Sequence, residues 1–374
     1  MGRVVITGLG CVTAAGVGIE PFRAAFSSDL PAGEVVAIAA ARGRKRPLRL
    51  ARLAPFDRQA YLPPRKLRRM GELSQLWVIC CLMARSDAGW DGAGDLLPPP
   101  EKRGTFLGTG FGCTETTWDY VTGMLRDGAA TANPYLFSES VANAPAGHSA
   151  IEMDTRGADI TLTCGDASAA MALDMAARAV AEGKLEMAYC GGAELMSEPL
   201  VRVLVSLRSP AFLGEGGACL ILESLDLARS RKARIYAEVA GSALGSDPLS
   251  PAADYGRDAD AIERVVRRAL SSAGAEGAVS ANTVRKVFLH AAGGKAEAAE
   301  REAVGRICPE APAEAVAANL GNLAAAGGLG LLAAAMEAGG PAGDTTGSPL
   351  LLVNSFGWGG SLASLVFRSA SALQ

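Results

Sequence analysis

The turn Cys164-Gly165-Asp166 is the part of the sequence whose residue types best suit covalent chemistry. It follows a short strand rich in β-branched residues and precedes an Ala-rich helix predicted for residues 167–182. Backbone N–H groups at a helix N-terminus stabilise negative charge, so a thiolate placed there has a lowered pKa and can act as a nucleophile. Cys164 is therefore a candidate nucleophile. Asp166 has a structural alternative, because aspartate is a favoured N-cap residue that stabilises a helix by about 1 kcal/mol.

Histidines and metal-ligand patterns are sparse. The chain has two histidines, His148 and His290, and eight cysteines without metal-ligand spacing. His290 ends a predicted strand before a glycine-containing turn, whereas His148 is interpreted as a packed, hydrogen-bonded residue. We therefore expect no metal site and no cofactor. The scattered cysteines, and an N-terminus without a signal-peptide pattern, predict reduced thiols in a cytoplasmic protein.

Strands and helices alternate along the chain and must position these residues. Apolar or β-branched runs predict strands, and apolar residues at helical spacing predict helices. The expected strands cover residues 4–6, 159–163, 187–190, 235–240, 287–290, 350–354 and 365–367, and residues 104–110 are expected to form a strand and then a glycine turn. The expected helices cover residues 15–30, 66–87, 114–127, 167–182, 258–273 and 323–338. Residues 31–64 show no clear element. The pattern starts again near residue 230, which predicts two similar parallel-sheet units, 1–230 and 231–374.

Composition and charge argue against several classes of protein. Apolar residues make up 49% of the chain and charged residues 20%, which is an ordinary globular balance. No apolar run is long enough to span a membrane. The net charge of −3 argues against general nucleic-acid binding. The segment from Arg42 to Arg69 is strongly basic, with Asp57 as its single acid. It is either a solvated face or a dock for an acidic partner.

Short motifs in a fixed order connect the sequence to a known family. They run from the N-terminus almost to the C-terminus: Arg3–Gly10, Ala144–His148, Gly191–Glu194, Gly214–Ala218 and Asn354–Gly360. In this order and spacing, the chain resembles the β-ketoacyl synthases of the thiolase-like superfamily. The resemblance implies an α/β chain with a thiolase-like, five-layer αβαβα fold made of two similar halves.

Two counts place Asp166 where the family has its nucleophilic cysteine. The family glycine nine residues before the nucleophile matches Gly157, and counting back from Gly191-Gly192 through Gly183 gives the same position. Cys164 therefore lies two residues too early. A carboxylate cannot replace the thiolate, because an acyl-carboxylate would be a mixed anhydride, too labile to hold a growing chain.

The rest of the family's condensing site is also incomplete. His290 matches the first family histidine, but Asn322 stands at the second one, and Ala317 stands at the position of the family lysine. Residues 194–214 form a shorter segment than in active members, by roughly a helix and a turn. The resemblance therefore implies that Asp166, His290 and Asn322 are degenerate positions and that no residue of this chain is catalytic.

Degenerate synthases of this kind resemble chain-length factors, the second subunits of type II polyketide synthases, although those usually have glutamine where this chain has Asp166. The resemblance implies a heterodimer with an active ketosynthase subunit, served by a phosphopantetheinylated acyl carrier protein. In it, this chain would shape the acyl tunnel and set polyketide or polyene chain length. The implied tunnel and gating residues are Phe356, Trp358, Trp118, Tyr120 and Met124. One alternative is a self-sufficient β-ketoacyl-acyl-carrier-protein synthase that uses Cys164. Another is a free-standing acyl-binding or scaffolding protein.

Overall fold

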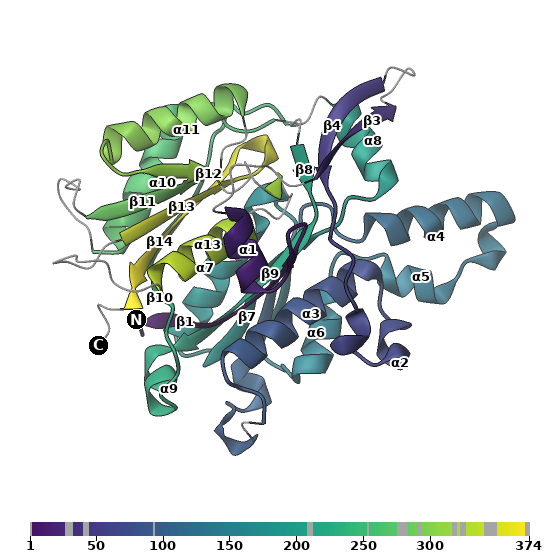
Figure 1. Cartoon of the computed structure of the whole chain (residues 1–374), viewed down its shortest axis with the longest axis horizontal. Coiled ribbons are helices and arrows are strands. Elements are labelled where there is room, and N and C mark those ends of the chain that lie inside the picture. The colour runs from purple at the N-terminus through teal and green to yellow at the C-terminus, as the bar shows by residue number, and fades with distance from the viewer. Residues whose placement is uncertain are drawn as a thin grey trace.

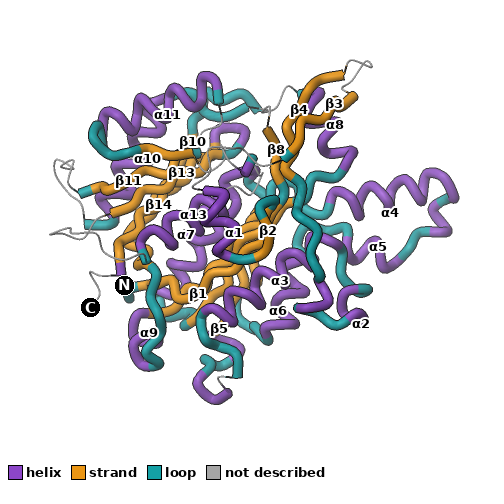
Figure 2. Tube along the Cα trace, in the orientation of Figure 1, coloured by secondary structure: helices purple, strands orange, loops and turns teal. Residues whose placement is uncertain are grey.

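The computed structural model shows one large β-sheet, a small second sheet, and helices that cover the large sheet (Figure 1, Figure 2). It describes residues 2–26, 33–39, 45–92, 94–207, 212–252, 254–274, 283–290, 293–315, 320–321, 327–339 and 350–370 of the 374. No helix in these ranges is long and apolar enough to cross a lipid bilayer.

Eleven strands of the described residues form the large sheet. They are β1 (Val4–Thr13), β2 (Gly16–Val17), β5 (Arg103–Gly108), β6 (Asp159–Leu162), β7 (Met187–Glu194), β9 (Gly216–Ser224), β10 (Ala237–Ser246), β11 (Val284–Leu289), β12 (Ala313–Ala315), β13 (Leu350–Phe356) and β14 (Ser361–Ser369). Strands β1, β7 and β13 are buried along their whole length, as their near-continuous apolar sequences require.

The strand order of the large sheet repeats. Strand β2 pairs with β1, and the other strands follow the order β12-β11-β13-β14-β10-β1-β9-β7-β5-β6. Without β2, the order outward from the centre is β1-β9-β7-β5-β6 in the first half and β10-β14-β13-β11-β12 in the second. Numbered along the chain within each half, both series read first, fifth, fourth, second and third strand. The halves meet where β1 and β10 pair antiparallel, with Val5 opposite Glu238. The fold thus has two similar halves, while the division at residue 230 stays a prediction.

The prediction of purely parallel units is wrong, because both halves of the sheet are mixed. Strand β5 pairs parallel with β6 and β7, and β11 pairs parallel with β12 and β13. Strands β9 and β14, however, run antiparallel to their neighbours. A parallel pair needs a crossover of about a dozen residues or more, whereas a short turn can join antiparallel strands. Only residues 357–360 separate β13 from β14, so that pair is antiparallel.

The α-helices of the described residues are α1 (Ile19–Phe26), α2 (Pro64–Leu67), α3 (Glu72–Asp87), α4 (Thr114–Asp127), α5 (Pro134–Glu139), α6 (Ala144–Met153), α7 (Ser168–Ala181), α8 (Glu198–Ser206), α9 (Leu225–Ser230), α10 (Ala259–Ser272), α11 (Gly294–Ile307) and α13 (Gly327–Ala338). Short 3-10 helices cover Arg58–Ala60, Gly94–Leu96, Pro100–Lys102, Ala129–Thr131, Gly165–Ala167 and Trp358–Gly360. Helices α4 and α5 project from the body of the molecule (Figure 1).

The helices arrange the large sheet into layers. Helices α7 and α13 contact each other and strands of both halves, so they form a central layer. Helices α3 and α6 pack on the strands of the first half, and α10 and α11 share a core with those of the second. Figure 1 shows α7 and α13 between the two halves and the outer pairs on opposite sides. The layers alternate as α-β-α-β-α, as the resemblance implies.

Two predictions for the first 90 residues are wrong. The helix predicted for residues 66–87 is two helices, α2 and α3, because Gly71 interrupts it as the N-cap residue of α3. Residues 31–64, where the sequence shows no clear element, contain β3 (Glu34–Ala39) and β4 (Lys45–Ala51), which pair antiparallel. Strand β4 also pairs parallel with β8 (Phe212–Gly214), which comes much later in the chain. A local pattern does not reveal so distant a partner.

Candidate functional site

The turn after β6 holds Asp166 in a buried position. A 3-10 turn covers Gly165–Ala167, and α7 begins at Ser168. Gly165 has a φ of +62°, a left-handed value that glycine adopts without strain. Ala167 occupies the N-cap position of α7, and no side chain caps it there. The capping interpretation of Asp166 is therefore wrong, and its carboxylate is used in another contact.

Three elements of the second half converge on Asp166, which is 5% exposed. The hydroxyl of Tyr255, from the connection between β10 and α10, donates a hydrogen bond to Oδ2 of Asp166. The hydroxyl of Ser355, in β13, donates to the backbone oxygen of Asp166 at 2.9 Å. Nε2 of His290, directly after β11, lies 3.8 Å from the same Oδ2, which is beyond hydrogen-bond distance.

His290 is fixed through its backbone, while one ring nitrogen lacks a partner. Its N–H donates to Oε1 of Glu300 at 3.0 Å, and Nδ2 of Asn354 donates to the same oxygen at 3.0 Å. Nε2 of His290 is buried without a hydrogen bond in the described part of the chain. Burial lowers the pKa of His290 to about 4, so the imidazole is neutral near pH 7.

Aromatic rings surround His290 and Tyr255. The ring centroids of Tyr255 and His290 are 5.0 Å apart, and those of His290 and Phe356 are 5.6 Å apart. Trp358 meets Tyr255 edge-on at 6.3 Å and Phe111 at 6.2 Å. Phe356 is 1% exposed, and Trp358 is half-buried. The structure therefore brings the predicted Phe356 and Trp358 next to the cluster at Asp166; their gating role stays a prediction.

Glu194, at the end of β7, is a second buried carboxyl close to this cluster. Its Oε2 accepts hydrogen bonds from the backbone N–H groups of Gly110 and Phe111, at 2.6 and 3.2 Å, and from the hydroxyl of Thr109 at 3.2 Å. Its Oε1 has no partner among the described residues. Burial raises the pKa of Glu194 to about 8, and repulsion from Asp166 adds to this shift. Glu194 is therefore mostly protonated at pH 7.

Cys164 is half-buried at the start of the same turn. Its backbone N–H donates to the hydroxyl of Ser168 at 2.8 Å, and none of the hydrogen bonds between described residues involves its thiol. The other seven cysteines are buried. Asn322 and Ala317, the positions of the second family histidine and of the lysine, lie outside the described residues.

Trp118, Tyr120 and Met124 lie on α4, away from the Asp166 cluster. No residue of α4 is buried, and the side chain of Trp118 is 53% exposed. The ring of Tyr120 contacts that of Phe137 in α5, with centroids 5.8 Å apart. Within this chain these side chains are not part of the Asp166 cluster. Their predicted tunnel role would require a second subunit.

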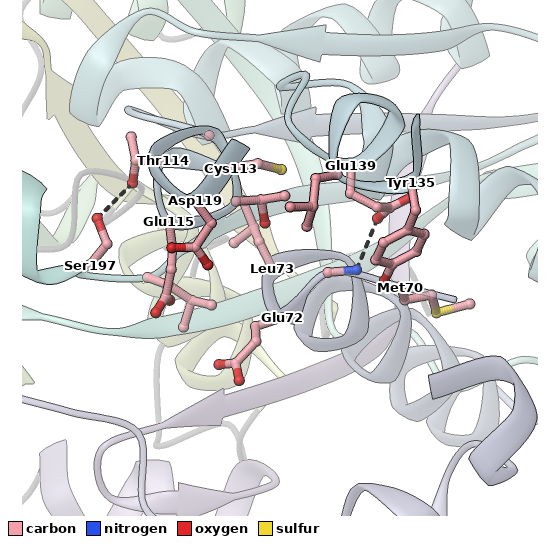
Figure 3. A pocket seen from close by; sticks show the side chains of 15 residues that line it. Met70, Glu72, Leu73, Cys113, Thr114, Glu115, Asp119, Tyr135, Glu139 and Ser197 are labelled. Carbon is pink, nitrogen blue, oxygen red and sulfur yellow. Dashed lines mark hydrogen bonds between the residues drawn. The ribbon is translucent and has the colours of Figure 1, made fainter. Parts of the chain in front are cut away.

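A separate cavity of about 240 Å³ lies where the N-termini of α3 and α4 meet α5 (Figure 3). Four carboxylates line it: Glu72, Glu115, Asp119 and Glu139. Glu139 accepts from the backbone N–H of Gly71 at 2.9 Å and pairs with Nε2 of His148 at 2.7 Å, as expected for a packed His148. Burial, together with the neighbouring Glu72 and Asp119, raises the pKa of Glu115. Apolar side chains also line the cavity: Met70, Leu73, Leu136 and Leu195.

Comparison with known proteins identifies the family. The family model for the N-terminal domain of β-ketoacyl synthases matches residues 1–219, more than half of the chain. The chain belongs to the β-ketoacyl synthase family. The 3-oxoacyl-acyl-carrier-protein synthase 2 of Rhizobium meliloti is 26% identical over 341 residues, which cover 82% of this chain and 78% of that protein.

Solved structures of ketosynthases share the fold. A β-ketoacyl synthase from Burkholderia phymatum superposes with a TM-score of 0.83 at 25% identity, covering 99% of this chain and 100% of that one. The ishigamide ketosynthase/chain length factor gives a TM-score of 0.81 at 23% identity, covering 98% and 99%. The predicted thiolase-like fold is thus confirmed.

Sequence reasoning missed Tyr255, Phe111 and Glu194 as members of the site. Tyr255 is 89 residues from Asp166 in the chain and belongs to no motif, so no spacing signals their contact. Glu194 ends the glycine motif of β7 and is a charged residue directly after an apolar run. That position could have marked it as a buried carboxyl.

Proposed function

We propose that this chain is a non-condensing subunit that pairs with an active ketosynthase, shapes the acyl tunnel and sets chain length in a type II polyketide synthase. The observation that supports this most directly is Asp166, at the nucleophile position of the family, buried and hydrogen-bonded by Tyr255. Family members hold the growing chain as a thioester. A carboxylate at this position cannot hold it in a stable form.

The neighbours of Asp166 also suit a subunit without condensing activity. Condensation requires decarboxylation of a carrier-bound malonyl unit and attack of its carbon on an acyl thioester. Nε2 of His290 faces a carboxylate at 3.8 Å instead of a thiolate. In this proposal the partner supplies the cysteine and both histidines. This chain supplies part of the subunit interface and of the wall of the acyl tunnel.

Two exposed features support pairing with another subunit. Helices α4 to α6 and the turns between them expose large apolar side chains: Trp118, Leu125, Phe137, Val141 and Ile151. Exposed apolar surface of this kind commonly marks a protein interface. Strand β6 lies at the end of the strand order, so one of its sides pairs with no other described strand. In a heterodimer, Trp118, Tyr120 and Met124 of α4 would then reach the shared tunnel.

A basic surface near α2 suits an acidic acyl carrier protein. Arg65, Arg68 and Arg69 are exposed, and none of them forms an ion pair in the described part of the chain. Lys66, in contrast, pairs with Glu152 at 2.5 Å. Unpaired guanidinium groups steer an acidic partner and bind phosphate groups well. We therefore propose a phosphopantetheinylated carrier protein as the second partner.

Co-purification with a candidate ketosynthase tests the pairing. The two chains are co-expressed with a tag on the ketosynthase only, and size-exclusion chromatography is expected to show a 1:1 complex. Leu125→Glu is expected to weaken the complex about tenfold or more, because it would bury a carboxylate in an apolar interface. Leu249→Glu is the matched control, since both leucines are 81% exposed but lie on different elements. Failure of the wild-type chains to co-elute would contradict the pairing.

The main alternative is a self-sufficient synthase that uses Cys164, which is half-buried at the start of the turn. Incubation of the purified chain with an acyl-carrier thioester, followed by intact-mass analysis, separates the two functions. We expect neither an acyl adduct nor elongation with malonyl carrier protein. An adduct that disappears in Cys164→Ser, together with elongation by the chain alone, would establish the alternative.

A further inference from the structure

We infer that Tyr255 is a built-in plug, whose side chain covers the carboxyl group of Asp166 and keeps a carrier-bound acyl group from the nucleophile position. Such a plug has a purpose only in a non-condensing subunit, so it rests on the proposed function. Three observations support it. The hydroxyl of Tyr255 contacts Asp166, its ring packs beside that of His290, and two sets of hydrogen bonds hold the connection between β10 and α10 that carries Tyr255.

The hydroxyl of Tyr255 lies where a reacting group would have to arrive. It donates to Oδ2 of Asp166, and Tyr255 is only 4% exposed. A thioester that approaches the side chain at position 166 must therefore displace this hydroxyl. Displacement breaks a hydrogen bond between two buried groups, which is unfavourable.

The ring of Tyr255 packs against aromatic residues of the second half beside Asp166. Its centroid lies 5.0 Å from that of His290 and 6.3 Å from that of Trp358. Trp358 in turn packs edge-on against Phe111, at 6.2 Å. The aromatic rings therefore form a continuous series of contacts beside Asp166. Removing the Tyr255 ring would open space in the middle of this series of rings.

Two sets of hydrogen bonds fasten the connection that presents Tyr255. The carboxylate of Asp247 accepts, at 2.8–3.2 Å, from three backbone N–H groups: those of Leu249, Arg257 and Asp258. The glycine loop holds the same connection, because Gly359 N–H donates to Asp254 O at 3.1 Å and Asp247 N–H donates to Gly360 O at 2.8 Å. Tyr255 directly follows Asp254. These bonds favour a fixed plug over a mobile lid.

The test places a thiol at position 166 and asks whether Tyr255 shields it. The double variant Cys164→Ser with Asp166→Cys is compared with the triple variant that adds Tyr255→Ala. Both are treated with iodoacetamide and followed by intact-mass spectrometry and peptide mapping. We expect alkylation at position 166 to become about tenfold faster or more when the ring is absent. Equal rates in the two variants overturn the inference.

Tyr236→Ala, in the same double-variant background, is the matched control. Tyr236 is 3% exposed and donates to Asp87 at 3.0 Å, so its loss also removes a buried tyrosine bonded to an aspartate. Equal acceleration by Tyr236→Ala and Tyr255→Ala would indicate general loosening and would overturn the plug. Tyr255→Phe keeps the ring, so alkylation is expected to stay slow.

The core thiols report whether each variant is folded. They are buried in the wild-type chain and should stay unmodified: Cys80, Cys81, Cys190 and Cys219. If these thiols react in the Tyr255→Ala variant, Tyr255→Leu is used in its place, because leucine fills more of the core. The assay contains no ketosynthase. A failed plug and a failed pairing are therefore distinguishable.

Discussion

Glu194→Gln is expected to remove a specific fall in stability between pH 6.5 and 8. Glu194 is 0% exposed, and burial raises the pKa of its carboxyl to about 8. The unfolded chain releases this proton near pH 4.3, the ordinary value for glutamate. Through this window the folded state therefore holds a proton that the unfolded state has lost. Because the native state binds more protons, its stability falls as the pH rises toward 8.

Above pH 6.5 the pH dependence of stability reports mainly on Glu194. The contribution of His290, which has the opposite sign, arises mostly at lower pH. Burial lowers the pKa of His290 to about 4, so between pH 4 and about 6.5 the unfolded state binds the extra proton and stability rises with pH. Above pH 6.5 a rise of only about 0.4 kcal/mol remains from His290, and it is the same in the wild-type chain and in Glu194→Gln. About 1.5 pH units at about 1.4 kcal/mol each give a loss of about 2 kcal/mol for Glu194. With an unfolding entropy of about 0.8 kcal/mol per kelvin for a chain of this length, the melting temperature falls by about 2–3 °C.

Calorimetric melting temperatures at pH 6.5 and pH 8 test this expectation. The wild-type chain should lose about 2–3 °C more than Glu194→Gln across the window, because glutamine copies the shape of the neutral acid and does not titrate. Glu238→Gln is the matched control. Glu238 is 4% exposed, and although burial opposes ionisation, Arg3 and Arg368 lower its pKa, so this variant keeps the wild-type pH dependence. Equal losses in the wild type and Glu194→Gln would refute the reasoning.

Three further outcomes follow from buried or tightly packed groups. Arg231→Met is expected to cost about 3–5 kcal/mol in urea unfolding, because it leaves the carboxylate of Glu223, at 0% exposure, without its partner at 2.5 Å; adding Glu223→Gln should recover part of this loss. Gly191→Ala is expected to cost about 3 kcal/mol or more, because the new Cβ would lie 2.0 Å from a carbonyl oxygen, whereas Gly147→Ala in α6 meets no atom within 4 Å and should not destabilise. Iodoacetamide should modify the folded wild-type chain first at Cys164, because the other seven thiols are buried; a first adduct elsewhere, by peptide mapping, would contradict the described core.

Features fixed by short-range chemistry could be predicted from the sequence. Periodic apolar residues placed the helix over 114–127 at the bounds of α4, and β-branched and apolar runs located most strands of the large sheet. Counting from the flanking glycines put Asp166 in the turn after β6, because the strand, turn and helix there follow one another along the chain. The family resemblance and the fold followed from motifs of the same local kind.

The contacts of Asp166 were decided only by the tertiary structure. Tyr255 reaches it across 89 residues because the connection after β10, strand β13 and the residue after β11 all meet at the turn before α7, and no local pattern encodes that meeting. The capping interpretation of Asp166 failed for the same reason, since its carboxylate bonds to a distant hydroxyl. The neutral state of His290 and the protonated state of Glu194 depend on burial by many residues at once. Local sequence therefore determined which residues occupy the site, and long-range packing determined their partners and charges.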